Sequence, residues 1–368
     1  MTFERIPATA PVRPTQEGDG FHVLTVVSLE REIDGDAASV SFEVPPDLAP
    51  CFVWSAGQHL TLQLVVDGQK IRRCYTISNP PGQPLRVTVK RASQGGVSAY
   101  ICDKLVVGDR VEVMPPSGNF ELVADRRLRR THYFFGAGSG ITPLFAMINE
   151  MLTAEPYSTA HLIYGNSDAG SILFRQQLEE LAQIYPGRFT LRHVLSEPSM
   201  WHWLTPWRQG RVDAAAIKAA LTETPPVAQD VQYWICGPGR MNADVTSALM
   251  ALDVPRSRIH LENFGAGTQQ DTSVTGVAAT ARVTLNGRTQ DLAIAADQTL
   301  LEAARAAGLS PPFHCQSGVC GACKARLTRG EVHMRAQMAL QEEEIEQGVI
   351  LTCQSVALAD QIDVCFEG

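Results

Sequence analysis

Four cysteines constrain this chain more than any other feature of its sequence. The stretch CQSGVCGAC holds Cys315, Cys320 and Cys323, and Cys353 follows much later, in LTCQS. Two irons need four thiolates, and the C-x4-C-x2-C…C spacing is that of a [2Fe–2S] centre, with three ligands from one short loop and one from a separate element. Zinc sites usually show two paired short spacings, so zinc or buried thiols explain this pattern less well. We therefore expect these four cysteines to bind a [2Fe–2S] cluster.

The sequence around these cysteines matches a small domain of mixed structure. ARVTLNG and RTQDLAI flank an Asn-Gly dipeptide, which is a strong hairpin signal, and residues 299–309 have helical periodicity. Gly318 and Gly321 are expected to let the backbone wrap tightly, so that its amides can point at the cluster sulfurs. Residues 281–368 resemble a plant-type ferredoxin with the α+β β-grasp fold.

The other cysteines do not form a disulfide framework. The chain has nine cysteines, an odd number, and five of them lie outside the four-cysteine pattern. We expect most of these five to be small core residues, with one exception at Cys236. His314 suggests a Rieske centre, but that needs two histidines in place of two cysteines, so a surface or supporting role fits better. A cluster bound by thiolates favours a reducing compartment, and we expect a cytoplasmic protein.

Residues 21–124 predict an antiparallel β-barrel, because short β-branched runs alternate there with turn residues. RCYTIS (residues 73–78) resembles the flavin motif Arg-x-Tyr-Ser/Thr of the ferredoxin–NADP reductase superfamily. The resemblance implies that Arg73 pairs with a flavin phosphate and Tyr75 stacks on the isoalloxazine. It also implies that Thr76 bonds near the reactive N5, as a catalytic residue, and that Ser78 belongs to the same flavin-binding set.

A second stretch of this region supports a flavin. VKRASQGGVSAY (residues 89–100) is similar to the family segment in which glycines and a serine precede a short helix. The resemblance implies that Gly96, Val97 and Ser98 receive the flavin pyrophosphate at the positive end of that helix. We therefore expect FAD. FMN is the alternative, because related reductases with this domain order use it.

Residues 125–265 predict an α/β doubly wound domain, since buried strands alternate with amphipathic helices. GAGSGITP connects the first strand to its helix and resembles the superfamily's NAD(P)H loop. Bare amides and a helix N-terminus at the end of a strand suit a pyrophosphate. The residues of this loop that we expect to bind NAD(P)H are Gly136, Gly138, Gly140 and Thr142.

Two motifs near the end of this domain point to the nicotinamide. The tripeptide CGP resembles the superfamily's Cys-Gly-Pro, which implies that Cys236 lies beside nicotinamide C4 as a catalytic residue and that Gly237 and Pro238 also bind NAD(P)H. HLENFGAG places Phe264 where family members have an aromatic residue against the flavin. The alternative for Phe264 is a plain core position. Glu262 is its candidate catalytic polar neighbour.

Coenzyme choice depends on the loop YGNSDAGSILFR (residues 164–175), where family members read the adenosine ribose. NADPH-using relatives often have an arginine just after YGN. Asp168 here repels a 2′-phosphate and suits a free 2′-hydroxyl, so NADH is favoured over NADPH. Arg175 and Arg192 are two basic residues that would compensate for Asp168. WHWLTPW, which carries three tryptophans, is expected to pack between domains, with stacking on a cofactor as the alternative.

Taken together, the order is a flexible tail (1–20), flavin barrel, nicotinamide domain, linker (266–280) and ferredoxin. A net charge of −8 without basic runs argues against nucleic acid, and no apolar run approaches the roughly 20 residues needed to cross a membrane. The whole resembles the reductases of three-component oxygenases of the phenylacetyl-CoA and betaine monooxygenase type. That implies electron flow from NAD(P)H through FAD and [2Fe–2S] to a terminal oxygenase, hydroxylase or desaturase.

Two other functions compete with this interpretation. A redox carrier or sensor would use the cluster alone, without hydride transfer, and the flavin and nicotinamide motifs argue against it. A self-sufficient oxygenase would need a mononuclear iron or haem site, and the sequence has no facial-triad motif in a suitable setting. Steady reduction of a dye by NAD(P)H distinguishes the reductase from the carrier.

Overall fold

A computed structural model describes most of the chain in two compact units, residues 1–264 and 265–368. The described residues are 20–66, 68–92, 96–198, 206–264, 271, 273–313, 316, 318, 320–337, 339–340 and 342–366. Residues 1–19 of the predicted tail and 266–270 of the predicted linker lie outside them. Among the described helices, none is long and apolar enough to cross a membrane.

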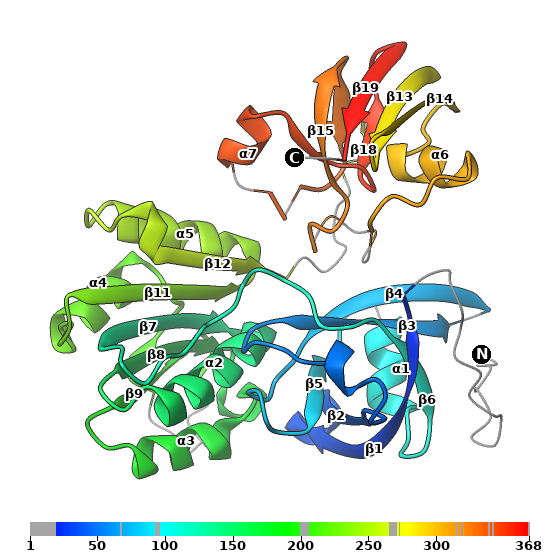
Figure 1. Ribbon diagram of the computed structural model, residues 1–368. Helices are drawn as coiled ribbons and strands as arrows, with labels where there is room; N and C mark the ends of the chain where they lie inside the picture. The colour runs from blue at the N-terminus through cyan, green and yellow to red at the C-terminus, as the bar shows by residue number, and fades with distance from the viewer. Residues whose placement is uncertain are drawn as a thin grey trace. The chain divides into compact units, whose positions relative to one another are not determined.

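The first unit begins with a six-stranded antiparallel sheet in the order β4-β3-β6-β1-β2-β5 (Figure 1). An isolated bridge between Ile77 and Val87 links the two ends of this order, which closes the sheet into the expected barrel. Alternate side chains point inward and form one apolar core. The elements are β1 (His22–Glu32), β2 (Ala37–Glu43), β3 (His59–Val66), β4 (Gln69–Thr76), β5 (Leu85–Lys90), α1 (Val97–Asp103) and β6 (Arg110–Val113).

The rest of the first unit is a parallel sheet in the order β10-β9-β8-β7-β11-β12. Helices α2 and α3 cover one face and α4 and α5 the other, as Figure 1 shows, so the predicted doubly wound domain is confirmed. The strands are β7 (Arg130–Ala137), β8 (Thr159–Asn166), β9 (Phe189–Leu195), β10 (Arg208–Gln209), β11 (Asp230–Gly237) and β12 (Ile259–Asn263). The helices are α2 (Ile141–Ala154), α3 (Arg175–Ile184), α4 (Ala214–Glu223) and α5 (Gly239–Met250).

Barrel and nicotinamide domain share a core. The cluster of buried side chains under α2 and α3 also contains Ala37, Ala56, Phe120 and Leu122 from the barrel and its closing segment. A flavin held by the barrel and a coenzyme held by the sheet therefore belong to one packed body.

The second unit is a five-stranded mixed sheet in the order β14-β13-β19-β15-β17, with a separate β16–β18 pair. Asn286 and Gly287 have φ values of 52° and 69°, which is the backbone of the predicted tight hairpin. Thr299 and Glu302 form a capping box at the start of the expected helix. The elements are β13 (Ala279–Leu285), β14 (Arg288–Ile294), α6 (Leu300–Ala306), β15 (Lys324–Arg329), β16 (Val332–Met334), α7 (Glu342–Glu346), β17 (Val349–Leu351), β18 (Ser355–Ala357) and β19 (Gln361–Cys365).

Candidate functional site

The glycine-rich turn after β7 packs directly on the Cys-Gly-Pro turn after β11. A Cβ atom at Gly140 would lie 2.0 Å from the Cys236 carbonyl oxygen and 2.9 Å from the Gly237 nitrogen, so only glycine fits. Gly138 has a φ of 54°, in the left-handed region that glycine adopts without strain. The structure thus brings the two motifs together at the carboxyl ends of neighbouring parallel strands, where α/β sheets bind nucleotides.

The same close packing explains the other loop positions. A Cβ at Gly136 would lie 2.8 Å from Leu144 Cδ1. The Thr142 hydroxyl donates to the Ser139 carbonyl at 3.0 Å, and the buried Tyr164 hydroxyl donates to the Gly138 carbonyl at 3.0 Å. These bonds fix the turn from both sides. Tyr164 opens the YGN stretch, but nothing in that stretch predicted its bond to the glycine-rich turn.

The Cys-Gly-Pro turn is equally tight at its second position. A Cβ at Gly237 would lie 2.5 Å from Met241 Cε. Pro238, which is exposed, directly precedes α5. The turn therefore leads from the buried end of β11 straight into the first turn of a helix.

Cys236 and Glu262 lie opposite each other on β11 and β12. Cys236 is fully buried. Burial raises the pKa of its thiol well above the usual value, and the nearby Glu262 carboxyl adds a smaller increase. Burial raises the pKa of Glu262 to about 8. At neutral pH both groups are therefore mostly uncharged, so the strand ends offer a nearly neutral surface to an incoming ring.

The end of β12 is held by a residue that sequence reasoning missed. Asn242 on α5 is buried, and its side-chain amide donates to the Glu262 carbonyl at 2.9 Å and to the Asn263 side chain at 2.8 Å. Phe264, just beyond, packs against the core shared by barrel and sheet. This packing agrees with the core alternative for Phe264, and its contact with a flavin stays a prediction.

The flavin strand β4 contains both Arg73 and Tyr75. Arg73 is exposed and its guanidinium donates to the Arg72 carbonyl at 2.8 Å. Tyr75 packs against the barrel core, and burial raises its pKa while the charge of Arg73 opposes that shift. An exposed guanidinium beside an aromatic ring fits the phosphate and ring of a flavin. Thr76, at the end of the strand, is buried.

Ser78 lies deeper than the motif suggests. It is fully buried, its hydroxyl lies 2.8 Å from the Thr88 hydroxyl, and it accepts a hydrogen bond from Arg86 Nε at 3.0 Å. The side chain of Ser78 is therefore engaged inside the barrel wall, and its role as a flavin contact stays a prediction.

The proposed pyrophosphate loop closes on itself. Gly96 has a φ of 72°, and the Ser98 hydroxyl accepts a hydrogen bond from the Ala92 nitrogen at 3.0 Å. Val97, the first residue of α1, is buried. This bond joins the first turn of α1 to Ala92, just after β5.

Asp168 begins the short 3-10 turn Ala169–Ser171 after β8. Its carboxylate accepts hydrogen bonds from the Gly170 nitrogen at 2.7 Å and from the Ser171 nitrogen at 3.0 Å. These bonds hold the charge at the carboxyl end of β8, where the adenosine ribose is expected.

The two compensating arginines already have carboxylate partners in this domain. Arg175 Nε lies 3.0 Å from Glu179, one helical turn on. Arg192 lies 3.1 Å from Glu223 and stands over the ring of Trp207, at 4.7 Å. Trp207 therefore packs inside the nicotinamide domain and not, as we expected, between domains; the segment's other two tryptophans lie outside the described residues.

In the second unit, two predicted cluster ligands lie together. Cys323 and Cys353 belong to one buried group, and the amide and hydroxyl of Thr352 donate to the Cys323 carbonyl at 3.1 and 3.0 Å. Cys320 is partly exposed, and Cys315 lies outside the described residues, as does His314. Over the described ranges, no three possible metal ligands converge, so the full ligand set stays a prediction.

The backbone around these thiols fits a bound cluster. Gly318 has a φ of 75°, and a Cβ there would lie 2.9 Å from the Ala336 carbonyl oxygen. The Gln354 side chain donates to the Gln316 carbonyl at 2.9 Å and lies 3.7 Å from Cys353 Sγ. Soft thiolates in a tight loop with glycine at a crowded, left-handed position are a suitable donor set for iron and sulfide.

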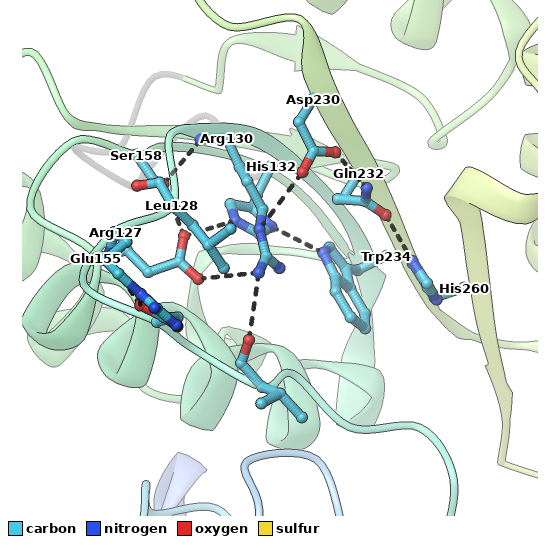
Figure 2. A network of polar contacts seen from close by, with 12 residues as sticks. Arg127, Leu128, Arg130, His132, Glu155, Ser158, Asp230, Gln232, Trp234 and His260 are labelled. Atoms are coloured by element: carbon cyan, nitrogen blue, oxygen red, sulfur yellow. Dashed lines mark hydrogen bonds and ion pairs between the residues drawn. The ribbon is translucent and has the colours of Figure 1, made fainter.

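A polar network at the other end of the nicotinamide sheet was also missed (Figure 2). His132 is fully buried; Trp234 Nε1 donates to its Nδ1 at 3.1 Å, and its Nε2 faces Glu155 at 3.4 Å. This pattern places the proton on Nε2, and burial lowers the His132 pKa. The network lies at the amino ends of the strands, away from the glycine-rich turn, so we assign it a structural role.

Comparison with known proteins agrees with this division of the chain. Residues 25–122 match the family described as Oxidoreductase FAD-binding domain, and residues 134–247 match the Oxidoreductase NAD-binding domain. Residues 283–358 match the 2Fe-2S iron-sulfur cluster binding domain.

Similar proteins span nearly the whole chain. It is 35% identical over 353 residues to a component of the 1,2-phenylacetyl-CoA epoxidase of Escherichia coli (strain K12), covering 94% of this chain and 98% of that protein. It is 33% identical to the 3-ketosteroid-9-alpha-monooxygenase, ferredoxin reductase component, of Rhodococcus rhodochrous. That match covers 94% of this chain and 97% of the relative. The structure of phthalate dioxygenase reductase superposes with a TM-score of 0.62 at 26% identity, covering 94% of this chain and 98% of that chain.

Proposed function

This chain belongs to the oxygenase-reductase type of the ferredoxin–NADP reductase superfamily, and on that premise we propose which of its residues carry each step and which coenzyme it uses. It is an NAD(P)H-dependent oxidoreductase with FAD and a [2Fe–2S] cluster, and it delivers electrons to an external terminal oxygenase. When bound, NAD(P)H supplies two electrons as hydride, FAD accepts the pair, and the cluster passes them on singly.

The contact between Gly140 and Cys236 is the observation that carries the proposal. It joins the turn proposed for the pyrophosphate to the turn proposed for the nicotinamide, so one extended dinucleotide reaches both. In this assignment Cys236 and Glu262 border the nicotinamide, while Arg73, Tyr75 and Thr76 hold the flavin. Because Cys236 and Glu262 are mostly uncharged, they would orient the nicotinamide ring against the flavin by packing and not by charge.

The proposed domain boundaries are 21–124, 125–265 and 281–368. Cys315, Cys320, Cys323 and Cys353 are the proposed cluster ligands. The proposed location is the cytoplasm, because these ligands need reduced thiols. The proposed partner is the oxygen-activating component of a multicomponent oxygenase, as in the systems named for the relatives.

The proposed coenzyme is NADH. The Asp168 carboxylate is fixed by two backbone amides. Arg175 and Arg192, by contrast, each pair with a glutamate. A 2′-phosphate would therefore meet a negative charge, and each arginine would have to leave its carboxylate to offset that charge. At a few ångströms such repulsion costs about 1 kcal/mol even in water, and more when partly shielded from solvent.

Comparing kcat/KM for the two coenzymes tests this choice. We expect NADH to be preferred, and Asp168→Ser to improve the relative use of NADPH by about tenfold, because the repulsion is removed. Asp244→Ser, at a carboxylate on the exposed side of α5, is the control and should change neither value. A wild-type preference for NADPH would contradict the proposal.

A further inference from the structure

Where the barrel meets the nicotinamide domain, one residue has an unusual backbone conformation. Phe174 precedes α3, at the end of the loop that begins with Asp168. It is buried, stacks on Phe145 with ring centroids 4.4 Å apart, and has a φ of 57°. Bulky residues seldom adopt this left-handed conformation, so surrounding contacts must hold it in place.

The barrel supplies two of those contacts. The guanidinium of Arg86, on β5, lies 5.5 Å from the centroid of the Phe174 ring. Burial raises the pKa of Glu32, the last residue of β1, and the backbone amide of Phe174, which faces its carboxylate, opposes part of that shift. Ile33 follows with a φ of 52° and packs against the core cluster that contains Phe174. Each domain thus contributes a residue with left-handed backbone to the packing of this shared core.

A buried line of hydroxyl groups connects this contact to the flavin strand. The Ser39 hydroxyl donates to Glu32 and lies 2.8 Å from the Thr88 hydroxyl. Thr88 in turn lies 2.8 Å from the Ser78 hydroxyl, to which Arg86 Nε also donates, at 3.0 Å. Ser78 directly follows β4, so this line of hydrogen-bonded groups runs from the flavin strand to Glu32, beside the coenzyme loop. We call Glu32, Arg86 and Phe174 the domain clasp.

We propose that the domain clasp of Glu32, Arg86 and Phe174 positions the reactants for hydride transfer, because it holds the loop of residues 168–174 in register with the flavin strand. The inference rests on the proposed binding of the coenzyme at this loop. The coenzyme is anchored on one domain and reacts with a group held by the other, so the distance between the two decides the rate. A displacement of about 1 Å at a reacting centre can cost a hundredfold in rate.

Charge makes the clasp specific. Burial lowers the pKa of Arg86, and the charge of Glu32 opposes that shift, so the two groups stabilise each other's charged forms. Loss of the Glu32 carboxylate removes both the acceptor for the Phe174 amide and the countercharge for Arg86. The amide would then be left without this partner, and the strained turn would relax.

The test uses the full-length protein with its cofactors and two variants, Glu32→Ala and Phe174→Leu. Anaerobic stopped-flow absorbance measures flavin reduction at saturating NADH. A second measurement follows electron transfer from flavin to cluster after photochemical reduction of the flavin without coenzyme. We expect the first rate to fall about tenfold in both variants and the second to stay unchanged, with full flavin content.

Two further variants separate positioning from simple stability. Glu32→Gln keeps an oxygen that faces the Phe174 amide but removes the negative charge beside Arg86, so it should recover only part of the lost rate. Glu43→Ala, at an exposed carboxylate on β2, should behave as wild type. Unchanged flavin reduction in Glu32→Ala and Phe174→Leu would overturn the proposal, as would an equal loss in both half-reactions. Reduction of the wild-type flavin by NADH tests the proposed function separately.

Discussion

The nicotinamide turns and the cluster loop are both rich in glycine, but they are held in different ways. Gly138 and Gly140 lie between a buried strand and a helix, and side-chain hydroxyls bond to this turn. The described part of the cluster loop contains three left-handed residues, Gln316, Gly318 and Gly321, one of which is not a glycine. The sheet fixes the first site, whereas the second departs from regular structure where the metal would bind.

The difference predicts opposite responses to mutation. A site built on strand ends keeps its shape without ligand, so substitutions there alter chemistry more than folding. A loop in strained conformations persists only when surrounding contacts over-determine it, and in a metal site the metal–ligand bonds supply many of them. Substitutions of cluster ligands should therefore change the fold of the second unit as well as electron transfer.

Replacing a cluster ligand is expected to give the largest effect. In Cys320→Ser the cluster should be lost, and delivery of electrons to the terminal oxygenase should fall by more than about 100-fold, since even supporting residues around metals cost 10–100-fold. NADH should still reduce the flavin, and small dyes that accept from flavin should still turn over. Visible absorbance and stopped-flow kinetics measure all three.

The matched control for this substitution is Cys365→Ser, in the same unit but outside the four-cysteine pattern. It should retain the cluster spectrum and electron delivery. Normal turnover of the oxygenase by Cys320→Ser would mean that the flavin donates directly, and would break the distinction between the two sites.

Cys236→Ala is expected to have the second largest effect, with the opposite pattern. Removing the buried thiol leaves space under the proposed nicotinamide position, so flavin reduction at saturating NADH should slow by about 10–100-fold, as expected for misplaced reactants. The cluster spectrum should be unchanged. Cys102→Ala, at a buried barrel cysteine, is the control for loss of a thiol. Unimpaired flavin reduction would remove Cys236 from the site.

The same contrast explains what the sequence could predict. Motifs that act through the backbone, such as GAGSGITP and CGP, could each be assigned to the coenzyme from sequence, because both follow strands of one parallel sheet whose carboxyl ends meet at one edge. The Asn-Gly hairpin and the fold class were confirmed for similar reasons, since local patterns determine both.

Contacts between segments distant in sequence could not be predicted. Asn242 carries no motif, and Tyr164 and Phe174 belong to YGNSDAGSILFR, which indicated only coenzyme choice. The roles of all three depend on which strand lies beside them. Expectations about Trp207 failed for this reason, because Arg192 and Glu223 meet it only in the folded sheet. A left-handed phenylalanine has no signal in a single sequence.

The pH dependence of Glu262 is the smallest predicted effect. Burial raises its pKa from 4.5 to about 8, so the carboxyl is neutral at pH 7 and becomes charged only above pH 8. Hydride departure leaves positive charge on the nicotinamide, which a nearby carboxylate stabilises. Flavin reduction should therefore rise a few-fold, on the order of 1 kcal/mol, as the pH passes through about 8.

Glu262→Gln should remove this rise, because an amide does not titrate, and Glu180→Gln, at an exposed carboxylate on α3, should retain it. The sign for stability is opposite. The folded state holds the proton more tightly, so the stabilisation is complete below pH 4.5 and is lost as the pH rises through about 8. Thermal unfolding measured at about pH 6 and about pH 9 should show a smaller decrease in Glu262→Gln than in wild type. The opposite outcome is a wild-type rate that does not change with pH, together with equal decreases in stability in wild type and Glu262→Gln. It would show that Glu262 stays charged, so that the nicotinamide site attracts its ligand by charge.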